Sequence, residues 1–354
     1  MNKIAFPHMG DYYVPANYLL SHIFPKDIII KAPKITNKTI EIGTKYSPDF
    51  VCTPFKYTLG TMIESLEEGA NILVQMGGGC RYGYYAELQE EILKELNYKC
   101  KVINLVKEGV TSPKRINKLL KQIDKKYSKI KAIYYSFIAF KMVKYMDQID
   151  DYIRKNIGFE IKKGSFESLK EEMLISFSYI KGYNDLKKTY KRYLKKFKNI
   201  KVRKPDNPIK IGIIGELYTI MEPFSNYYLE KALAQKGIEI TRFTNVYYLL
   251  FQKAKKFKKY QKYSKNYFKY SMGADASDNI ARCKYLCENK YDGIIHIKSS
   301  FCTPEIGAMP IINNLAAKYN IPVLFFSFDS ATSETGVITR LEAFYDMLEM
   351  RRRK

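Results

Sequence analysis

Tryptophan is absent from this 354-residue sequence, histidine occurs three times and cysteine six times. The first residues lack a basic segment followed by a long apolar run, so no secretory signal is predicted. Without such a signal, six cysteines argue against a disulfide framework and leave metal or redox chemistry open. The most apolar window, residues 131–143, contains lysines and is too short to span a bilayer. We therefore expect a cytoplasmic protein without a membrane segment.

Acidic residues are scarce beside basic ones, with 36 Asp and Glu against 60 Lys and Arg and a net charge of +24. Much of the excess lies in two lysine-rich runs with interleaved tyrosine and phenylalanine, residues 185–204 and 251–269. Such runs can follow a nucleic-acid backbone, or they can be amphipathic helices with solvated lysines. Arginine is scarce in both and no nucleic-acid-binding motif accompanies them, so we favour the helices. A nucleic-acid partner is then an alternative that rests on charge alone.

The order of apolar and amphipathic runs predicts an α/β protein with two Rossmann or flavodoxin-like lobes and mainly parallel sheets. We expect an N-terminal lobe over 1–128, a helical segment and linker over 129–204, and a flavodoxin-like lobe over 205–354. The stretch VRKPDNP, with two prolines, ends the helical segment. In the second lobe, residues 225–237 are expected to form one helix that ends on glycine.

Three cysteines occupy similar positions in the predicted elements. Cys80 follows the strand-like NILVQM and its glycines, Cys302 follows the strand-like YDGIIHIKS, and Cys52 precedes a proline at the start of a helix. Helix N-termini favour thiolates. Because the three cysteines precede helices of both lobes, we predict that they share one site in the interdomain cleft. The spacing fits no zinc finger, whereas three thiolates suit an iron–sulfur cluster with one iron left open. The alternative is three unrelated buried cysteines.

The motifs CTPFKYTLG, GGGCRYGYY and FCTPE, with the opening IAFPHMGDYY and the closing TRLEAFYDML, resemble one family. It is the 2-hydroxyacyl-CoA dehydratase and CoA-enzyme activase-related family, which includes dehydratase subunits and double-cubane cluster reductases. The resemblance implies two Rossmann-like lobes and a [4Fe–4S] cluster held by Cys52, Cys80 and Cys302. It also implies a separate ATP-hydrolysing activator of the actin and Hsp70 superfamily, since the sequence has no G-x-x-x-x-G-K-[ST] loop. A homodimer, or a heterodimer with a related subunit, is compatible with it.

Further site residues are expected around such a cluster. Lys56 and Arg81 are close in sequence to the cysteines, where cations stabilise a reduced cluster or hold an anionic substrate; both can instead be surface residues. Glu216 and Glu305 are candidate proton donors, although Glu305 can also be an ordinary acid in the first turn of a helix. His8 can line the cleft or simply pack.

The spare cysteines, Cys100, Cys283 and Cys287, are predicted to be core residues, so an [8Fe–9S] double cubane is the less favoured cluster. Nothing in the sequence marks a CoA site. The favoured hypothesis is an iron–sulfur component that receives low-potential electrons and reduces a small ligand or acyl-CoA at an open iron. The alternative is a non-catalytic iron–sulfur scaffold or electron carrier in a larger complex.

Overall fold

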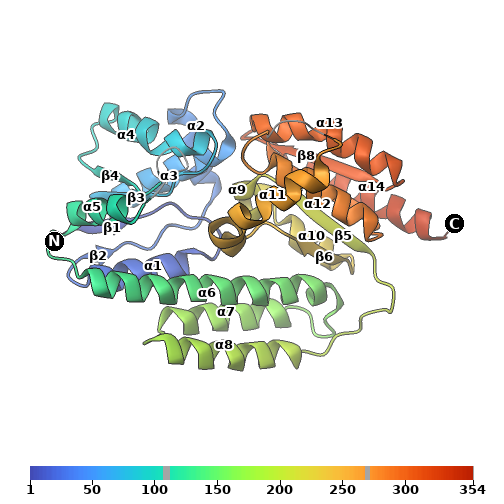
Figure 1. Ribbon diagram of the computed structural model, residues 1–354, viewed down its shortest axis with the longest axis horizontal. Helices are drawn as coiled ribbons and strands as arrows, with labels where there is room; N and C mark the ends of the chain where they lie inside the picture. The colour runs from blue at the N-terminus through green and yellow to red at the C-terminus, as the bar shows by residue number, and fades with distance from the viewer. Residues whose placement is uncertain (107–111, 268–271, 354) are drawn as a thin grey trace. The chain divides into compact units, whose positions relative to one another are not determined.

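The computed structural model describes residues 1–106, 112–267 and 272–353 (Figure 1). The chain forms two compact units, Met1–Met142 and Val143–Lys354. Each unit is built on one parallel four-stranded sheet, which confirms the α/β fold class expected from the sequence. In these described ranges no helix combines the length and apolarity needed to cross a membrane.

The sheet of the first unit has the strand order β2-β1-β3-β4. Its strands are β1 (Lys3–Ala5), β2 (Ile28–Ile29), β3 (Ile72–Gln75) and β4 (Lys101–Asn104). Its helices are α1 (Tyr13–Ile23), α2 (Asn37–Tyr46), α3 (Thr53–Glu67), the 3-10 helix η1 (Arg81–Tyr84), α4 (Tyr85–Glu95) and α5 (Pro113–Ile123). Helix α6 (Lys129–Asn156) begins in this unit and ends in the next.

Helices α2 and α3 pack with their backbones in close approach. A Cβ atom on Gly43 would lie 1.9 Å from the carbonyl oxygen of Lys56, and one on Gly60 would lie 2.0 Å from that of Thr39. Because no side chain fits at either contact, these two positions require glycine. The contact fixes α3, which begins directly after Cys52.

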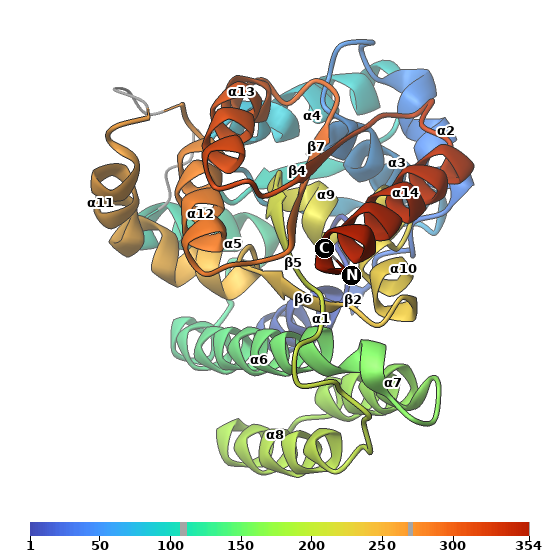
Figure 2. The ribbon, with the colours of Figure 1, turned by 90° about the vertical axis from the view of Figure 1, so that its right-hand side faces the viewer.

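The sheet of the second unit has the order β6-β5-β7-β8. Its strands are β5 (Lys210–Gly215), β6 (Glu239–Arg242), β7 (Gly293–Ser299) and β8 (Val323–Phe328). Its helices after α6 are η2 (Ile157–Phe159), α7 (Ser165–Ser178), α8 (Tyr183–Lys198), α9 (Leu217–Met221), η3 (Phe224–Asn226), α10 (Leu229–Gln235), the π-helix η4 (Tyr248–Gln252), α11 (Lys253–Ser264), α12 (Ala276–Glu288), α13 (Thr303–Lys318) and α14 (Glu334–Arg353). Helices α12 and α13 cover one face of the sheet, and α10 and α14 lie on the other (Figure 2).

Helices α6, α7 and α8 occupy the segment expected to be helical (Figure 1). Tyr145 of α6 stacks on Tyr190 of α8, with ring centroids 4.0 Å apart. Helix α8 buries Tyr193 and Phe197, whereas its lysines are exposed. The run 185–204 therefore contains the amphipathic helix that we favoured, and in the run 251–269 residues 268–269 lie outside the described ranges. The lobe boundaries after residues 128 and 204 stay a prediction.

The helix expected over 225–237 is interrupted. Tyr227 and Tyr228 both have φ of +54° and separate η3 from α10. The Asn226 side chain donates to the carbonyl of Thr219 at 2.7 Å and accepts from the amide of Leu229 at 3.0 Å. These contacts hold a turn where helical periodicity alone predicts a continuous helix.

Candidate functional site

Two of the predicted cysteine ligands belong to neighbouring loops of the first unit. Cys52 is the N-cap residue of α3, and Cys80 is the N-cap residue of η1. The guanidinium Nη2 of Arg81 donates to the Sγ of Cys52 at 3.7 Å, and the backbone N–H of Tyr82 donates to the Sγ of Cys80 at 3.5 Å. Arg81 thus joins the two cysteine loops and places a positive charge beside a sulfur atom.

The glycines before Cys80 do not all serve the same purpose. A Cβ atom on Gly77 would lie 1.9 Å from the carbonyl oxygen of Val106, which follows β4. A Cβ atom on Gly79 would have no other atom within 4 Å. The close approach of a neighbouring chain segment therefore requires glycine at 77 and not at 79.

The third predicted ligand, Cys302, lies in the second unit at the carboxyl end of β7. It is the N-cap residue of α13, is 7% exposed, and its backbone N–H donates to the carbonyl of Ser299 at 3.0 Å. Lys298 is buried in the same segment, and its Nζ donates to the carbonyl of Ser300 at 3.2 Å. A buried cation therefore lies four residues before this thiol.

Glu305 is not a solvent-exposed acid of a helix terminus. Its side chain is 1% exposed, and its Oε2 lies 2.7 Å from the Nε2 of His296. Its Oε1 accepts from Asn279 at 2.9 Å, and the same Asn279 nitrogen donates to the carbonyl of Gly215 at 2.9 Å. Glu305 thus belongs to a buried network that connects the end of β5 and the middle of β7 with α12 and α13.

Glu216 lies at the carboxyl end of β5 and caps α9. Its carboxylate accepts from the backbone N–H groups of Tyr218 and Thr219 at 2.8 and 2.9 Å, and from the hydroxyl of Thr219 at 2.6 Å. Burial nevertheless raises the pKa of Glu216 to about 7, because desolvation outweighs these three hydrogen bonds and Asp275 adds repulsion. This carboxyl group can therefore hold or release a proton near neutral pH.

The remaining candidates have varied surroundings. Lys56 is buried on α3, so it is not a surface residue. His8 is 7% exposed and stacks on Tyr13, with ring centroids 5.9 Å apart. Cys283 and Cys287 are buried on α12, Cys100 is partly buried against the core of the first unit, and all six cysteines are free thiols.

The family model of the 2-hydroxyglutaryl-CoA dehydratase D-component matches residues 23–348. The chain belongs to this family. A search among curated proteins gave no match. The matched range includes Cys52, Cys80 and Cys302, so family membership confirms the resemblance that their motifs indicated.

The three cysteines of this D-component family member fit an iron–sulfur cluster by their donor chemistry. Each is a free thiol immediately before a helix, and two of the sulfur atoms accept N–H donors, as cluster ligands commonly do. In the described part of the chain, no three His, Cys, Asp or Glu residues are grouped as a metal site. The ligand set therefore stays a prediction.

Sequence reasoning missed the polar residues beneath these loops. In the first unit, Gln75 donates to Gln89 at 2.9 Å, and Gln89 donates to the hydroxyl of Thr58 at 2.7 Å, all of them buried. In the second unit it missed His296 and Lys298. The available signal was a polar residue within or at the end of an otherwise apolar strand, because such a residue needs a buried partner.

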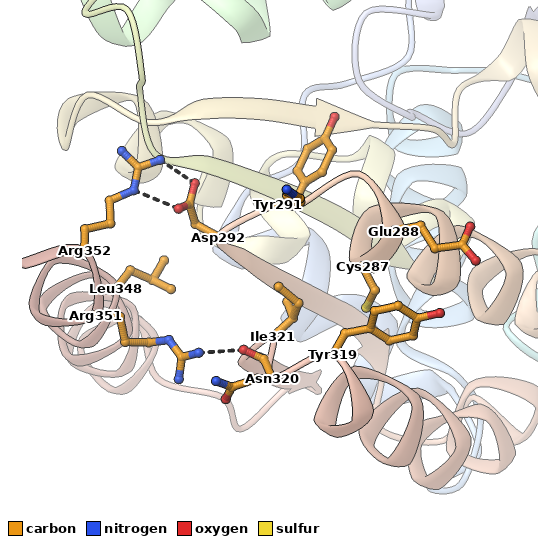
Figure 3. Close-up of a pocket in the computed structure, with 11 residues that line it drawn as sticks. Cys287, Glu288, Tyr291, Asp292, Tyr319, Asn320, Ile321, Leu348, Arg351 and Arg352 are labelled. Atoms are coloured by element: carbon orange, nitrogen blue, oxygen red, sulfur yellow. Dashed lines mark hydrogen bonds and ion pairs between the residues drawn. The ribbon is translucent and has the colours of Figure 1, made fainter. Parts of the chain in front are cut away.

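A cavity of about 580 Å³ opens at the amino end of the second sheet (Figure 3). Arg352 forms two 2.7 Å contacts with the carboxylate of Asp292, and Arg351 donates to the carbonyl of Asn320 at 2.5 Å. These arginines hold α14 against the sheet, so both guanidinium groups of this cavity already have structural partners. Ligands of open α/β sheets bind at the opposite edge, beyond the carboxyl ends of the strands.

Proposed function

We propose that this member of the dehydratase D-component family is the iron–sulfur protein of a 2-hydroxyacyl-CoA dehydratase-type or ATP-dependent reductase system. Cys52, Cys80 and Cys302 hold a [4Fe–4S] cluster in this proposal. When bound, the cluster supplies one-electron transfer and an iron position that no thiolate fills. The substrate is an acyl-CoA or another small ligand with an oxygen atom at the reacting carbon.

One observation carries the proposal: the guanidinium of Arg81 lies 3.7 Å from the sulfur of Cys52 and adjoins Cys80 in the sequence. A fixed cation in this position stabilises negative charge on sulfur ligands. Arg81 is also exposed, so a carboxylate or carbonyl oxygen of a substrate can reach its guanidinium. Its role is to orient the substrate and to compensate added charge.

Glu216 is the proposed proton donor of the second unit. A carboxyl group with a pKa of about 7 is protonated in a substantial fraction of molecules at neutral pH, and it can transfer that proton to a leaving oxygen. Glu305 is proposed to support the Cys302 segment through its contacts with His296 and Asn279. The first residue is thus assigned a chemical role and the second a positioning role.

The electron donor in this proposal is a separate ATP-hydrolysing activator. The sequence lacks a P-loop motif and carries a net charge of +24. An activator with an acidic docking surface would associate faster at low ionic strength, because opposite charges steer the encounter. Salt should therefore slow the activation, whereas ATP hydrolysis by this chain alone would contradict the assignment.

Anaerobic purification followed by iron and sulfide analysis tests the cluster. We expect about four irons and four sulfides per chain. Replacing Cys52, Cys80 or Cys302 with alanine should abolish cluster binding, because each removes one ligand. Cys100→Ala is the matched control and should keep the full iron content, since this thiol packs against the core of the first unit.

The result that would exclude the proposal is an anaerobic preparation without iron, or a Cys80→Ala variant with unchanged iron. Activity is then measured with an activator, ATP and a 2-hydroxyacyl-CoA. A chain that keeps its cluster but neither accepts activator electrons nor binds an acyl-CoA would show that the cluster assignment holds and the dehydratase assignment does not.

A further inference from the structure

A second cavity, of about 490 Å³, lies in the second unit beyond the carboxyl end of β6. Its walls come from the end of α6, the loop after β6, η4 and α11, and they include Lys144, Tyr247, Tyr248, Lys256 and Tyr260. Parallel α/β sheets bind their ligands at this edge. Nothing in the proposed cluster chemistry uses this cavity.

The acidic groups of the cavity already have partners. The carboxylate of Asp147 accepts a backbone N–H from the start of η4 at 2.9 Å, and Asp151 pairs with Arg154. Arg242, which also lines the cavity, pairs with Glu230 at 2.8 Å. These contacts are internal to the protein, so the carboxylates offer little to a cationic ligand.

Two lysines of the cavity have no such partner. Within residues 1–106, 112–267 and 272–353, neither Lys144 nor Lys256 forms an ion pair. The Nζ of Lys144 lies 5.5 Å from the ring centroid of Tyr247, and that of Lys256 lies 5.6 Å from the ring centroid of Tyr248. The tyrosine rings thus hold both ammonium groups at the cavity by cation–π contact.

A third cation, Arg282, lies against the ring of Tyr248, which lines the cavity. Arg282 is 1% exposed, and its guanidinium carbon lies 4.5 Å from the ring centroid of Tyr248. Its Nη1 donates to Thr244 at 2.7 Å and to Asn279 at 3.1 Å, whereas its Nε and Nη2 have no hydrogen-bond partner in the described part of the chain. The nearby Asp278 accepts from the Tyr248 hydroxyl at 2.7 Å and lies 3.8 Å from the Nζ of Lys253, whereas Arg282 forms no ion pair within the described residues.

Lys256 lies close to other cations. Burial, followed by repulsion from Arg282 and Lys259, lowers the pKa of Lys256. A bound anion would relieve that repulsion, and the relief is greatest for a doubly charged group. Ammonium groups bind phosphate as point charges without the planar geometry that an arginine–carboxylate pair requires.

We propose that this cavity binds the phosphate group of an organic phosphate ester. Lys144 and Lys256 contact the phosphate, and Arg282 adds positive potential from behind Tyr248. A volume of about 490 Å³ is in the usual range for small-molecule sites and exceeds what a single phosphate ion fills. The phosphate is therefore expected to be esterified to an organic group. The proposal is independent of the cluster, because no residue that lines the cavity is a proposed ligand or site residue of the cluster.

Isothermal titration calorimetry of the full chain tests this assignment with three probes: inorganic phosphate, ribose 5-phosphate and adenosine 5′-monophosphate. We expect at least one ester to bind more tightly than inorganic phosphate. Lys144→Gln and Lys256→Gln should each weaken that ester about tenfold, the cost of one charge-assisted hydrogen bond. Neither lysine is fully buried, so both variants should fold, and their thermal unfolding without ligand should match the parent chain.

Lys258→Gln is the matched control, since Lys258 is exposed on the same helix two positions further on and does not line the cavity. It should leave the affinity unchanged. Absence of binding by both esters at millimolar concentration would overturn the proposal, as would equal weakening in the control. If inorganic phosphate bound as tightly as the better ester, the proposal that the ligand is a phosphate ester would be overturned.

Discussion

Replacing Glu216 with glutamine removes a buried carboxyl group whose pKa burial raises from its ordinary value of 4.5 to about 7. In the unfolded chain this group ionises at the ordinary value, so between the two pKa values the folded state binds more protons. Stability therefore falls as the pH rises through this window. Glutamine cannot ionise, and its amide oxygen can still accept from Tyr218 or Thr219.

The magnitude follows from the size of the shift. Each pKa unit corresponds to about 1.4 kcal/mol, so ionising Glu216 in the folded state costs about 3 kcal/mol once the pH exceeds the folded pKa. Between pH 5 and pH 8 the parent chain should lose about 2 to 3 kcal/mol more stability than Glu216→Gln. All other titrating groups are common to both chains and cancel in this comparison.

Urea unfolding followed by circular dichroism at pH 5 and pH 8 measures this difference. Thr219→Val provides a second test, because it removes the hydroxyl that donates to the carboxylate at 2.6 Å. That loss should raise the pKa of Glu216 further and move the fall in stability to higher pH. Parallel pH dependence of the parent chain and Glu216→Gln would refute the burial argument.

Three further predictions concern the two cysteine-bearing regions. Gly77→Ala should destabilise the chain by about 2 kcal/mol in thermal unfolding, because its Cβ would clash with the Val106 carbonyl. Gly79→Ala is the control and should be neutral. Equal effects of the two substitutions would mean that the clash is absent. Glu305→Ala should cost about 3 kcal/mol in urea unfolding, since it leaves the buried His296 without this partner and removes one of the two acceptors of Asn279. Glu305→Gln should restore part of the loss. A neutral alanine variant would show that this network does not stabilise the fold. Arg81→Ala should keep the iron content but abolish turnover. Redox titration should show that the cluster has become harder to reduce. An unshifted potential would limit Arg81 to a structural role.

The alternation of strands and helices could be predicted because it depends on local patterns. Apolar runs such as those of β5 and β7 are short and bounded by loops, which is typical of strands in a parallel sheet covered on both faces. The break at Tyr227 and Tyr228 could not be predicted, because the spacing of apolar residues over 225–237 is that of a continuous helix. Contacts of Asn226 with Thr219, seven residues earlier, determine the turn instead.

The same distinction applies to the candidate site. The strand–loop–helix pattern by itself determined that Cys52, Cys80 and Cys302 precede helices, and the family model confirmed the resemblance carried by their motifs. Only the tertiary structure decided that Arg81 reaches the sulfur of Cys52, 29 positions away in the chain.

Burial also depended on the tertiary structure. Glu305 reads as an ordinary first-turn acid, yet packing of α12 and α13 over β7 removes it from water and pairs it with His296. The crowding of Lys256 and Arg282 around Tyr248 likewise involves α11, α12 and η4. Local propensity determines which element a residue joins, whereas desolvation and charge depend on neighbours that only the folded chain brings together.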